Sequence, residues 1–410
     1  MSRVLISLMA VVMFMMTSCG GRFEEPVLYA FDQTVMQEAR AQIQSGKFLH
    51  MAAYDKLIAE AEDLLNQEPV SVMDKSLTAP SGDKHDYFSM APYWWPNPKT
   101  SDGLPYIRKD GETNAAARNL DNKAMGQMES MVRKLALAYY FTADDRYAEK
   151  AIDQLRMWYV DPQTRMNPNM NYAQVVLGHN NNWGRSFGLI DKYGCVYLMD
   201  AIRILRSSKS FSDADFVAIQ NWYDDFVEWM RTSKNGTAES VTKNNHATAY
   251  DAQIVAYALM AGREDVVNEV LSQFMQRRIY KQVQPDGSQP EELARTNSYS
   301  YTTYNIRIAL SMCNMAQVLG VDFLSQTSED GRSIPKMIEF MSQYLGVEQS
   351  QYPYEQINKW DSAQNQAYQI LYWADGKFPD KGYDKILARA EKYKIAEASL
   401  FWLTGAVGMN

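Results

Sequence analysis

Apolar residues recur along most of this chain at the three- and four-residue spacing of one buried helix face. In residues 124–140 the apolar positions are Met125, Met128, Val132, Leu135 and Tyr139. That spacing predicts an amphipathic helix. The same pattern recurs in residues 54–65, 147–159, 196–205, 216–230, 247–260, 266–279, 304–319, 337–345 and 363–373. The chain is therefore expected to be almost entirely helical.

Short connections indicate how these helices are joined. Gly262 and Gly320 each follow an apolar stripe, where a helix C-cap glycine is expected. The connection at 261–265 is short, which predicts antiparallel hairpins of consecutive helices. Strand signals are scarce, and residues 279–283 are the best candidate. We expect an all-α fold, an (α/α) toroid or incomplete barrel of about six or seven helical hairpins, with a generic helical array as the alternative.

Four segments interrupt the helical pattern, and loops of their length in a helical protein usually carry function. They are residues 81–118, 161–185, 233–246 and 285–304. No low-complexity linker divides the chain. We therefore expect one toroid domain over residues 20–410, with the four segments on one rim.

The first residues have the pattern of an export signal. Arg3 precedes an apolar run, residues 4–16, that is too short to span a bilayer. The residues around Cys19 resemble a bacterial lipobox, so residues 1–18 are expected to be a signal peptide and Cys19 to be lipidated. An ordinary secretory signal is the alternative. The protein is then exported, as a periplasmic or outer-membrane-anchored lipoprotein whose lipid is its only membrane contact.

Composition narrows the partners. The formal net charge of −8 argues against nucleic acid, so an anionic ligand must be met by a local basic patch. Cys195 and Cys313 fall inside predicted helices and are expected to be inert core thiols. The four histidines form no metal-binding motif, so we expect neither a catalytic metal nor a cofactor.

The clearest polar motif is Lys-Asn-Asn-His-Ala-Thr at residues 243–248, at the expected start of a helix. Amide and imidazole donors beside a helix N-terminus suit a carboxylate. Alternatively, Asn244 or Asn245 caps the helix and His246 is satisfied in the core.

A second motif joins Arg295 to three tyrosines, Tyr299, Tyr301 and Tyr304. Arginine recognises carboxylates with two hydrogen bonds. It can also lower the pKa of a neighbouring phenol, so that phenolate becomes available as a base. The alternative is an aromatic helix face with an ion-paired arginine.

Two of the four interrupting segments, residues 81–118 and 161–185, combine amides, aromatic rings and cations in the way that suits the hydroxyls and carboxylates of sugars. Both also fit a polar loop or a packed rim of the toroid. The candidate substrate-binding residues in these two segments are Trp94, Trp95, Tyr172, Gln174, His179, Asn182, Trp183 and Arg185. Asn244, Tyr299 and Tyr304, from the two motifs above, are further candidates.

Several phrases in order along the chain resemble the alginate lyase domain family, helical-toroid polysaccharide lyases of polysaccharide-degrading bacteria. The resemblance covers roughly residues 85–350, and its phrases lie at residues 121–125, 135–151, 161–174, 243–248 and 286–301. It implies β-elimination on an anionic polysaccharide, alginate or a related polyuronate.

The resemblance also implies roles for individual residues. Asn245 and His246 match the pair that neutralises the substrate carboxylate, and Arg295 matches the arginine of the later motif. The catalytic tyrosine follows that arginine by about two helical turns; Tyr301 fits best, with Tyr299 and Tyr304 open as alternatives. The segment around Asn182 departs from the family pattern, so its role as a carboxylate ligand is weaker.

The chemistry favours mannuronate-type linkages. The C5 hydrogen and O4 lie on one face of mannuronate, so one tyrosine can serve as base and then acid without a metal. The alternatives are a glucuronan or other polyuronate lyase, an α/α-toroid glycoside hydrolase built on two of Asp251, Asp286, Glu291 and Glu292, and a non-catalytic glycan-binding lipoprotein.

Overall fold

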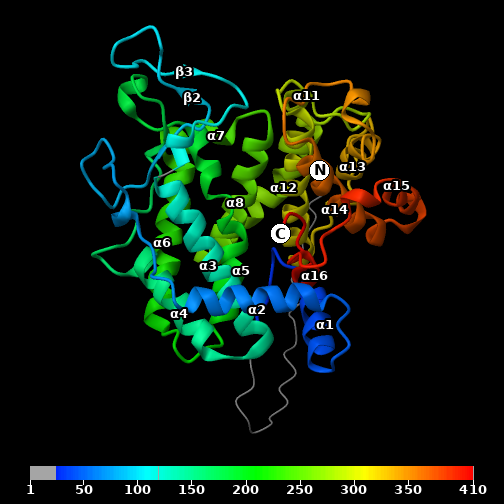
Figure 1. Ribbon diagram of the computed structural model, residues 1–410, viewed down its shortest axis with the longest axis horizontal. Helices are drawn as coiled ribbons and strands as arrows, with labels where there is room; N and C mark the ends of the chain where they lie inside the picture. The colour runs from blue at the N-terminus through cyan, green and yellow to red at the C-terminus, as the bar shows by residue number, and fades with distance from the viewer. Residues whose placement is uncertain (1–24, 119, 410) are drawn as a thin grey trace, which may run out of the picture.

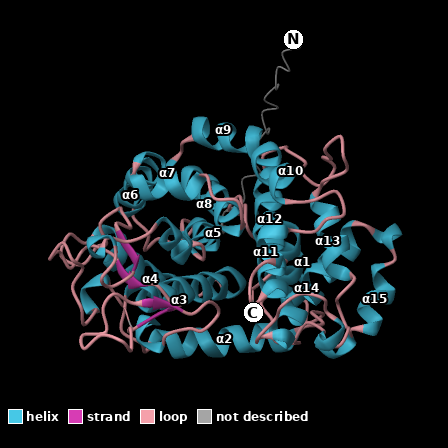
Figure 2. Cartoon of the chain, turned by 90° about the horizontal axis from the view of Figure 1, so that it is seen from above, coloured by secondary structure: helices cyan, strands magenta, loops and turns pink. Residues whose placement is uncertain are grey.

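A series of long helices forms the inner wall of the molecule, each packed against the next (Figure 2). The computed structural model describes residues 25–118 and 120–409, so the expected signal peptide and Cys19 lie outside the described residues. The inner helices, in the order in which they contact one another, are α3 (Asp121–Thr142), α5 (Cys195–Leu205), α8 (Asn245–Ala261), α12 (Ser298–Val318) and α14 (Trp360–Lys377).

Further helices cover the outside of this series. Among them, α4 packs on α3, α9 on α8, α13 on α12 and α14, and α15 on α14, while α6 lies against α8. Their bounds are α4 (Asp145–Leu155), α6 (Asp213–Thr232), α9 (Glu264–Phe274), α13 (Ile334–Ser342) and α15 (Tyr383–Arg389). Four inner helices thus pack against the outer helix that follows them in the chain, whereas α6 follows α5 but packs against α8. The expected all-α toroid is confirmed.

The two ends of the described chain meet at the bottom of Figure 1, where α2 (Met51–Leu65) crosses below α3. The short helix α16 (Phe401–Thr404) packs against both α1 (Gln33–Gln44) and α2. Asp200 on α5 fixes the incoming chain, because its buried carboxylate accepts backbone N–H groups from Tyr29, Ala30 and Phe31 at 2.6–3.1 Å. These contacts stabilise the ring where it is not closed by an inner helix.

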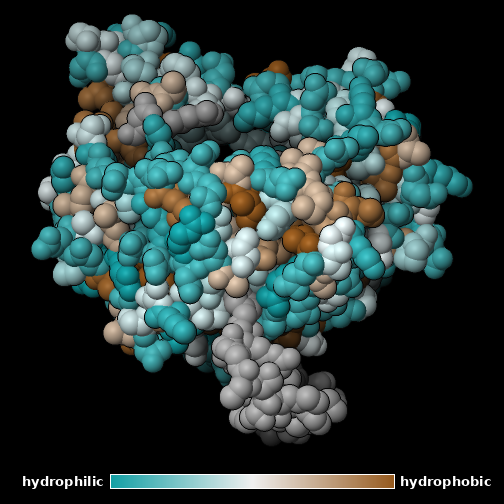
Figure 3. All heavy atoms as spheres, turned by 60° about the horizontal axis from the view of Figure 1, so that its bottom comes forward, coloured by the Kyte–Doolittle hydropathy of each residue, from teal (hydrophilic) through white to brown (hydrophobic). Residues whose placement is uncertain are grey.

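The inner helices are buried on nearly every side. In α8 almost all residues from Ala247 to Ala258 are buried, so this helix is apolar around most of its circumference rather than along one stripe. Cys195 on α5 and Cys313 on α12 are free and buried, as expected of core thiols. Figure 3 shows one face of the exterior, which is mainly hydrophilic with hydrophobic side chains in scattered groups. No helix within the described residues is both long and apolar enough to cross a membrane.

The few strands lie in the loop segments. One parallel pair joins β1 (Phe88–Met90) to β4 (Tyr172–Val175), and one antiparallel pair joins β2 (Trp94–Trp95) to β3 (Ile107–Arg108). The expectation of a strand at residues 279–283 is wrong. A π-helical turn, Met275–Ile279, continues there into α10 (Tyr280–Gln282). Ile279 and Val283 are four residues apart and both buried, so both lie on the same face of a helical segment.

The four interrupting segments gather at one end of the toroid, at the top of Figure 1, where β2, β3, α7 (Lys234–Ser240) and α11 (Pro290–Leu293) lie. The segment 233–246 is not all loop, because α7 occupies half of it. Helix α8 begins at Asn245, and the Asn244 side chain accepts the backbone N–H of His246 as its N-cap.

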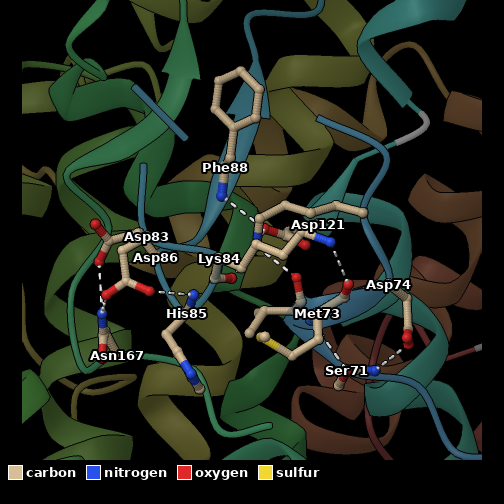
Figure 4. A network of polar contacts seen from close by, with 12 residues as sticks. Ser71, Met73, Asp74, Asp83, Lys84, His85, Asp86, Phe88, Asp121 and Asn167 are labelled. Carbon is tan, nitrogen blue, oxygen red and sulfur yellow. Dashed lines mark hydrogen bonds and ion pairs between the residues drawn. The ribbon is translucent and has the colours of Figure 1, made fainter. Parts of the chain in front are cut away.

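A buried ion pair fixes the arm that carries β1 and β2 to the toroid (Figure 4). Lys75 Nζ lies 2.8 Å from the Asp121 carboxylate, and neither side chain is exposed. The same carboxylate, in the first turn of α3, accepts the backbone N–H of Phe88 at 2.8 Å. Burial raises the pKa of Asp121 to about 6 despite the attraction of Lys75, and burial lowers the pKa of Lys75.

Removing one partner of this ion pair should lower the free energy of unfolding of the arm or of the whole domain. Lys75→Ala leaves Asp121 as a buried, unpaired carboxylate, so we expect a loss of about 3–5 kcal/mol in the free energy of unfolding. Lys134→Ala removes an ion pair with Glu60 that is partly exposed on both sides, and should cost no more than about 1 kcal/mol. Denaturant unfolding measures both; equal losses would refute the structural importance of the buried pair.

Candidate active site

A cavity of about 560 Å³ opens at the end of the toroid where the four segments meet. Every one of the segments contributes to its wall, together with the start of α12. The polar lining residues are Tyr93, Arg108, Gln174, Arg185, Asn244, Asn245, His246, Glu291, Arg295, Tyr301 and Tyr304, beside Pro92, Trp94, Phe187 and Ile190. Side chains far apart in sequence therefore face one volume large enough for a sugar unit.

Tyr301, in the first turn of α12, is held by an arginine and a second tyrosine. Arg295 Nη2 donates to the Tyr301 hydroxyl oxygen at 2.9 Å, and the guanidinium carbon lies 3.9 Å from the centre of the Tyr301 ring. The hydroxyl oxygens of Tyr93 and Tyr301 are 2.9 Å apart and hydrogen-bonded. The Tyr301 hydroxyl thus has a cation on one side and a proton-exchanging partner on the other.

The protonation of Tyr301 differs from the expectation. Burial raises its pKa, the neighbouring Tyr93 raises it further, and Arg295 opposes both without cancelling them. Arg295 lowers the pKa of Tyr301 as expected, but the expected net lowering is wrong for the empty cavity, because desolvation of the phenolate outweighs the attraction of one guanidinium. Tyr301 is therefore a neutral phenol at neutral pH in the empty cavity.

Arg295 is itself positioned by a carboxylate. Its Nη2 donates to Asp110 Oδ1 at 3.0 Å, and Arg108 donates to the same oxygen at 2.7 Å. Burial alone would raise the pKa of Asp110, but the two guanidiniums more than offset it and lower that pKa. Asp110 is consequently ionised, and it holds two cavity-lining arginines side by side.

The Asn245–His246 pair at the start of α8 is held by two buried glutamates. Asn245 donates its backbone N–H and its side-chain Nδ2 to Glu292, at 2.6 and 2.7 Å. His246 Nδ1 lies 2.6 Å from Glu239, on α7. That contact keeps a proton on Nδ1, so Nε2 is the ring atom free for another partner. Burial raises the pKa of Glu292 to about 7, although the donors of Asn245 lower it.

Arg185 adds a third guanidinium, with its carbon 6.0 Å from the ring centre of Trp94 and 5.4 Å from that of Phe187. It donates to Gln174 Oε1 at 2.7 Å, and Gln174 donates to Asp191 at 2.7 Å. Burial lowers the pKa of Arg185 to about 10, which still leaves it charged at neutral pH. Gln174 has a φ of +50°, a strained backbone for a non-glycine residue, of the kind that clusters at functional sites.

Of the three candidate tyrosines, Tyr301 and Tyr304 line the cavity and Tyr299 does not. Tyr304 follows Tyr301 by three residues on one helix face, and burial raises its pKa to about 12. Tyr299 is 1% exposed, packs against Tyr352 and Trp360, and donates its hydroxyl to the backbone oxygen of Met341. Including Tyr299 among the substrate-binding residues is therefore wrong, because α12 turns it into the core.

Five other candidate residues lie outside the cavity, because their side chains form contacts within the loops that carry them. Asn180, Asn181 and Asn182 all have left-handed φ values, which asparagine tolerates, and Asn182 accepts the N–H of Gly178. His179 bonds the Tyr106 carbonyl and packs edge-on against Trp94, while Trp183 stacks on Tyr172 at 5.1 Å. Trp95 donates to the Glu112 carbonyl. These residues shape the wall behind Trp94 and Arg185.

The sequence interpretation missed Tyr93, Arg108 and Phe187, and the carboxylates Asp110, Glu239 and Glu292 as positioning groups. Several act on a partner distant in sequence, as Tyr93 does on Tyr301 and Asp110 on Arg295, so the spacing within one motif gave no signal for them. Tyr93 had a local signal, because it directly precedes the candidate substrate-binding residues Trp94 and Trp95.

The cavity is built to hold an anion beside a phenol. Three arginines, His246 and Asn245 offer donors, whereas Glu291 is the one carboxylate among the described lining residues. Asp251 is bound by Arg277 and Arg278, Glu292 by Asn245, and Asp286 by the N–H of Ser288. The pair of facing carboxylates that a glycoside hydrolase uses is therefore not assembled here. No group of three metal-ligating side chains occurs in the part of the chain that the structure describes.

Comparison with known proteins gives a consistent result. Residues 71–351 match the family model described as alginate lyase. The structure resembles that of an alginate lyase from Bacteroides ovatus, with 39% identity, a TM-score of 0.88, and coverage of 92% of this chain and 99% of that one. A variant of alginate lyase A1-III shares the fold at 13% identity, with a TM-score of 0.58 and coverage of 86% and 88%. No curated protein sequence matches.

The Tyr93–Tyr301 contact can be tested without a substrate. Tyr93→Phe removes a group that raises the pKa of Tyr301, so the Tyr301 phenol should titrate at lower pH. Arg295→Gln removes the opposing charge and should move that titration to higher pH. NMR of tyrosines labelled at the ring carbon bearing the hydroxyl measures both, with Tyr280→Phe as a control away from the cavity. An unchanged titration in Tyr93→Phe would contradict the contact.

Proposed function

We propose that this chain, which belongs to the alginate lyase family and is a polysaccharide lyase, cleaves alginate at mannuronate-type linkages by β-elimination, with Tyr301 as base and acid. The observation that carries the proposal is the convergence of Tyr301, Arg295, Asn245 and His246 on one cavity. The tetrasaccharide in a solved complex of an A1-III lyase variant, 14% identical to this chain with a TM-score of 0.53 and coverage of 82% of this chain and 90% of that one, supports a saccharide ligand.

The carboxylate of the reacting uronate is bound by the donors at the start of α8 and by Arg295. Removal of the C5 proton leaves negative charge that spreads onto this carboxylate, and fixed donors stabilise that charge as an oxyanion hole does. Glu292 and Glu239 hold the Asn245 amide and the His246 ring before substrate arrives. The donors therefore need little reorganisation during the reaction.

The Tyr301 phenolate takes the C5 proton, the C5–H electrons form the C4=C5 double bond, and the C4–O4 bond breaks. The Tyr301 phenol then returns its proton to the departing O4. Before the C5 proton is removed, the Tyr301 hydroxyl passes its own proton to the Tyr93 oxygen at 2.9 Å while Tyr93 releases its proton to water, and Arg295 stabilises the resulting phenolate. One hydroxyl can serve both steps when C5–H and O4 lie on one face, which favours mannuronate. Guluronate needs a second group, and His246 Nε2 is the candidate.

Export and lipidation at Cys19 are part of this proposal. They are supported by Arg3, the apolar run at residues 4–16 and the lipobox-like residues before Cys19. An exported lyase meets its polymeric substrate where the polymer is, outside the cytoplasm.

Tyr301→Phe should keep the fold and substrate binding but nearly abolish formation of the unsaturated uronate. The change removes one oxygen that takes part in proton transfer and leaves the ring packed on Arg295. Ultraviolet absorbance of the conjugated product during digestion of polymannuronate, polyguluronate, glucuronan and hyaluronan measures it. Tyr304→Phe is the matched control on the same helix face. If Tyr301→Phe stays active and Tyr304→Phe is dead, Tyr301 is not the base.

Loss of one carboxylate donor should cost roughly 10²–10³ in kcat, by analogy with oxyanion-hole deletions. Arg295→Ala and Asn245→Ala test this, with Arg263→Ala, which breaks a surface ion pair with Asp224, as the control. Steady-state kinetics on the best polymer gives the comparison after circular dichroism has verified folding. Full activity in either cavity variant would refute its assignment.

A further inference from the structure

A second cavity, of about 590 Å³, lies next to the first and is unusually basic. Its walls come from the turn after α7, the π-helical turn with α10, and the start of α11. Four cations and one carboxylate carry its charge: Lys243, Arg277, Arg278, Lys281 and Glu291. In a chain with a formal net charge of −8, this concentration of positive charge requires an explanation.

The two arginines are held side by side by one buried carboxylate. Asp251, on α8, is fully buried and accepts bonds from Nε and Nη2 of both Arg277 and Arg278. One carboxylate neutralises only one of the two guanidiniums, so the pair keeps a net positive charge. Each Nη1 group takes no part in these bonds.

The backbone is distorted where these arginines lie. Residues Met275–Ile279 form a π-helical turn at the end of α9, and π-helical turns inside helices occur frequently at functional sites. Consecutive residues of an ideal helix point about 100° apart. The wider turn brings Arg277 and Arg278 to the same carboxylate, and so places two guanidiniums at one wall of the cavity.

The remaining cations of the cavity are not neutralised. Lys243 and Lys281 are exposed, and neither forms an ion pair with any part of the chain that the structure describes. Unpaired cations at one concave surface suit an anionic ligand.

The two cavities adjoin one another. Glu291 lines both, and the consecutive residues Lys243 and Asn244 face the second and the first cavity respectively. A ligand that extends out of the first cavity past this turn enters the second one. Polyuronate chains carry one carboxylate on every sugar, so a sugar beyond the reacting unit presents an anion there.

We infer that the cavity around Arg277, Arg278, Lys243 and Lys281 is a second uronate-binding site, which takes the carboxylate of a sugar farther along the polymer chain bound for cleavage. This inference rests on the proposed function. The site favours long anionic chains over short ones, because only a long chain occupies both cavities. It adds affinity without touching the reacting bond.

The test compares a long polymannuronate with a dimer, which has one sugar on each side of the cleaved bond and none farther along. The double variant Lys243→Gln/Lys281→Gln changes two exposed side chains and leaves the Asp251 pair intact. We expect the ratio of kcat/KM on polymer to kcat/KM on dimer to fall roughly two- to thirtyfold, the loss expected from two exposed charge contacts. The loss should shrink as salt concentration rises, because exposed charges are screened.

Lys209→Gln/Lys385→Gln is the matched control, because it removes the same charge from two exposed lysines that line neither cavity. Its ratio should equal that of the wild type. If the wild type cleaves polyuronate but both double variants give the same ratio, the second site is wrong and the proposed function stands. If the wild type releases no unsaturated product, the proposed function fails. Calorimetric binding of polymannuronate to wild type and variants then decides the second site alone, because equal affinities overturn it.

Discussion

The carboxylate of Glu292 joins the starts of two inner helices, and the arrangement of the cavity depends on that contact. Glu292 lies in the short helix α11, which precedes α12 in the chain, and it accepts both the backbone N–H and the side-chain amide of Asn245, the first residue of α8. The first N–H groups of a helix have no partner within it, so an acceptor from another element both satisfies α8 and fixes its position relative to α12. Asn245 and His246 come from one of these helices and Tyr301 from the other.

Burial of the Glu292 carboxylate at that junction disfavours its charged form, and the same environment affects the other ionisable groups of the site. The same desolvation that raises the pKa of Glu292 to about 7 also raises the pKa of Tyr301 and lowers that of Arg185 to about 10. All three shifts disfavour charge in the empty cavity. A uronate carboxylate entering between Arg295, Arg185 and His246 meets donors that are poorly solvated and already oriented, which makes each interaction stronger than it is in water. The neutral phenol of the empty site is the consequence of the environment that makes the site bind anions.

The sequence predicted the parts of this design that depend on local spacing. Helical periodicity predicted the inner helices, and the spacing of Arg295 and Tyr301 predicted that both line one cavity. A cap by Asn244 or Asn245 was the alternative to a binding role, and Asn244 is the N-cap. The prediction from sequence failed where the position of a side chain is determined by contacts with residues distant in the chain. Asn182 is of a residue type that could bind a ligand, but it lies in a turn with left-handed φ values. Tyr299 is directed into the core by its position on α12. Tyr93 reaches Tyr301 across 208 positions, and no pattern within the motif of Tyr301 could have indicated it.

The positive charges at the loop end also explain how an acidic protein can take an anionic polymer. Elsewhere several arginines have a carboxylate of their own, as Arg206 has Asp213. Others contact two carboxylates, as Arg156 does Asp153 and Asp215, and such groups leave little field beyond the surface. At the two cavities the ratio is reversed, because Asp110 is shared by Arg108 and Arg295, and Asp251 by Arg277 and Arg278. Each shared carboxylate fixes two guanidiniums yet neutralises only one. Sharing acids among bases therefore gives rigid geometry and a local positive charge together, and under the proposed function this charge attracts an anionic polymer to the loop end of an otherwise acidic chain.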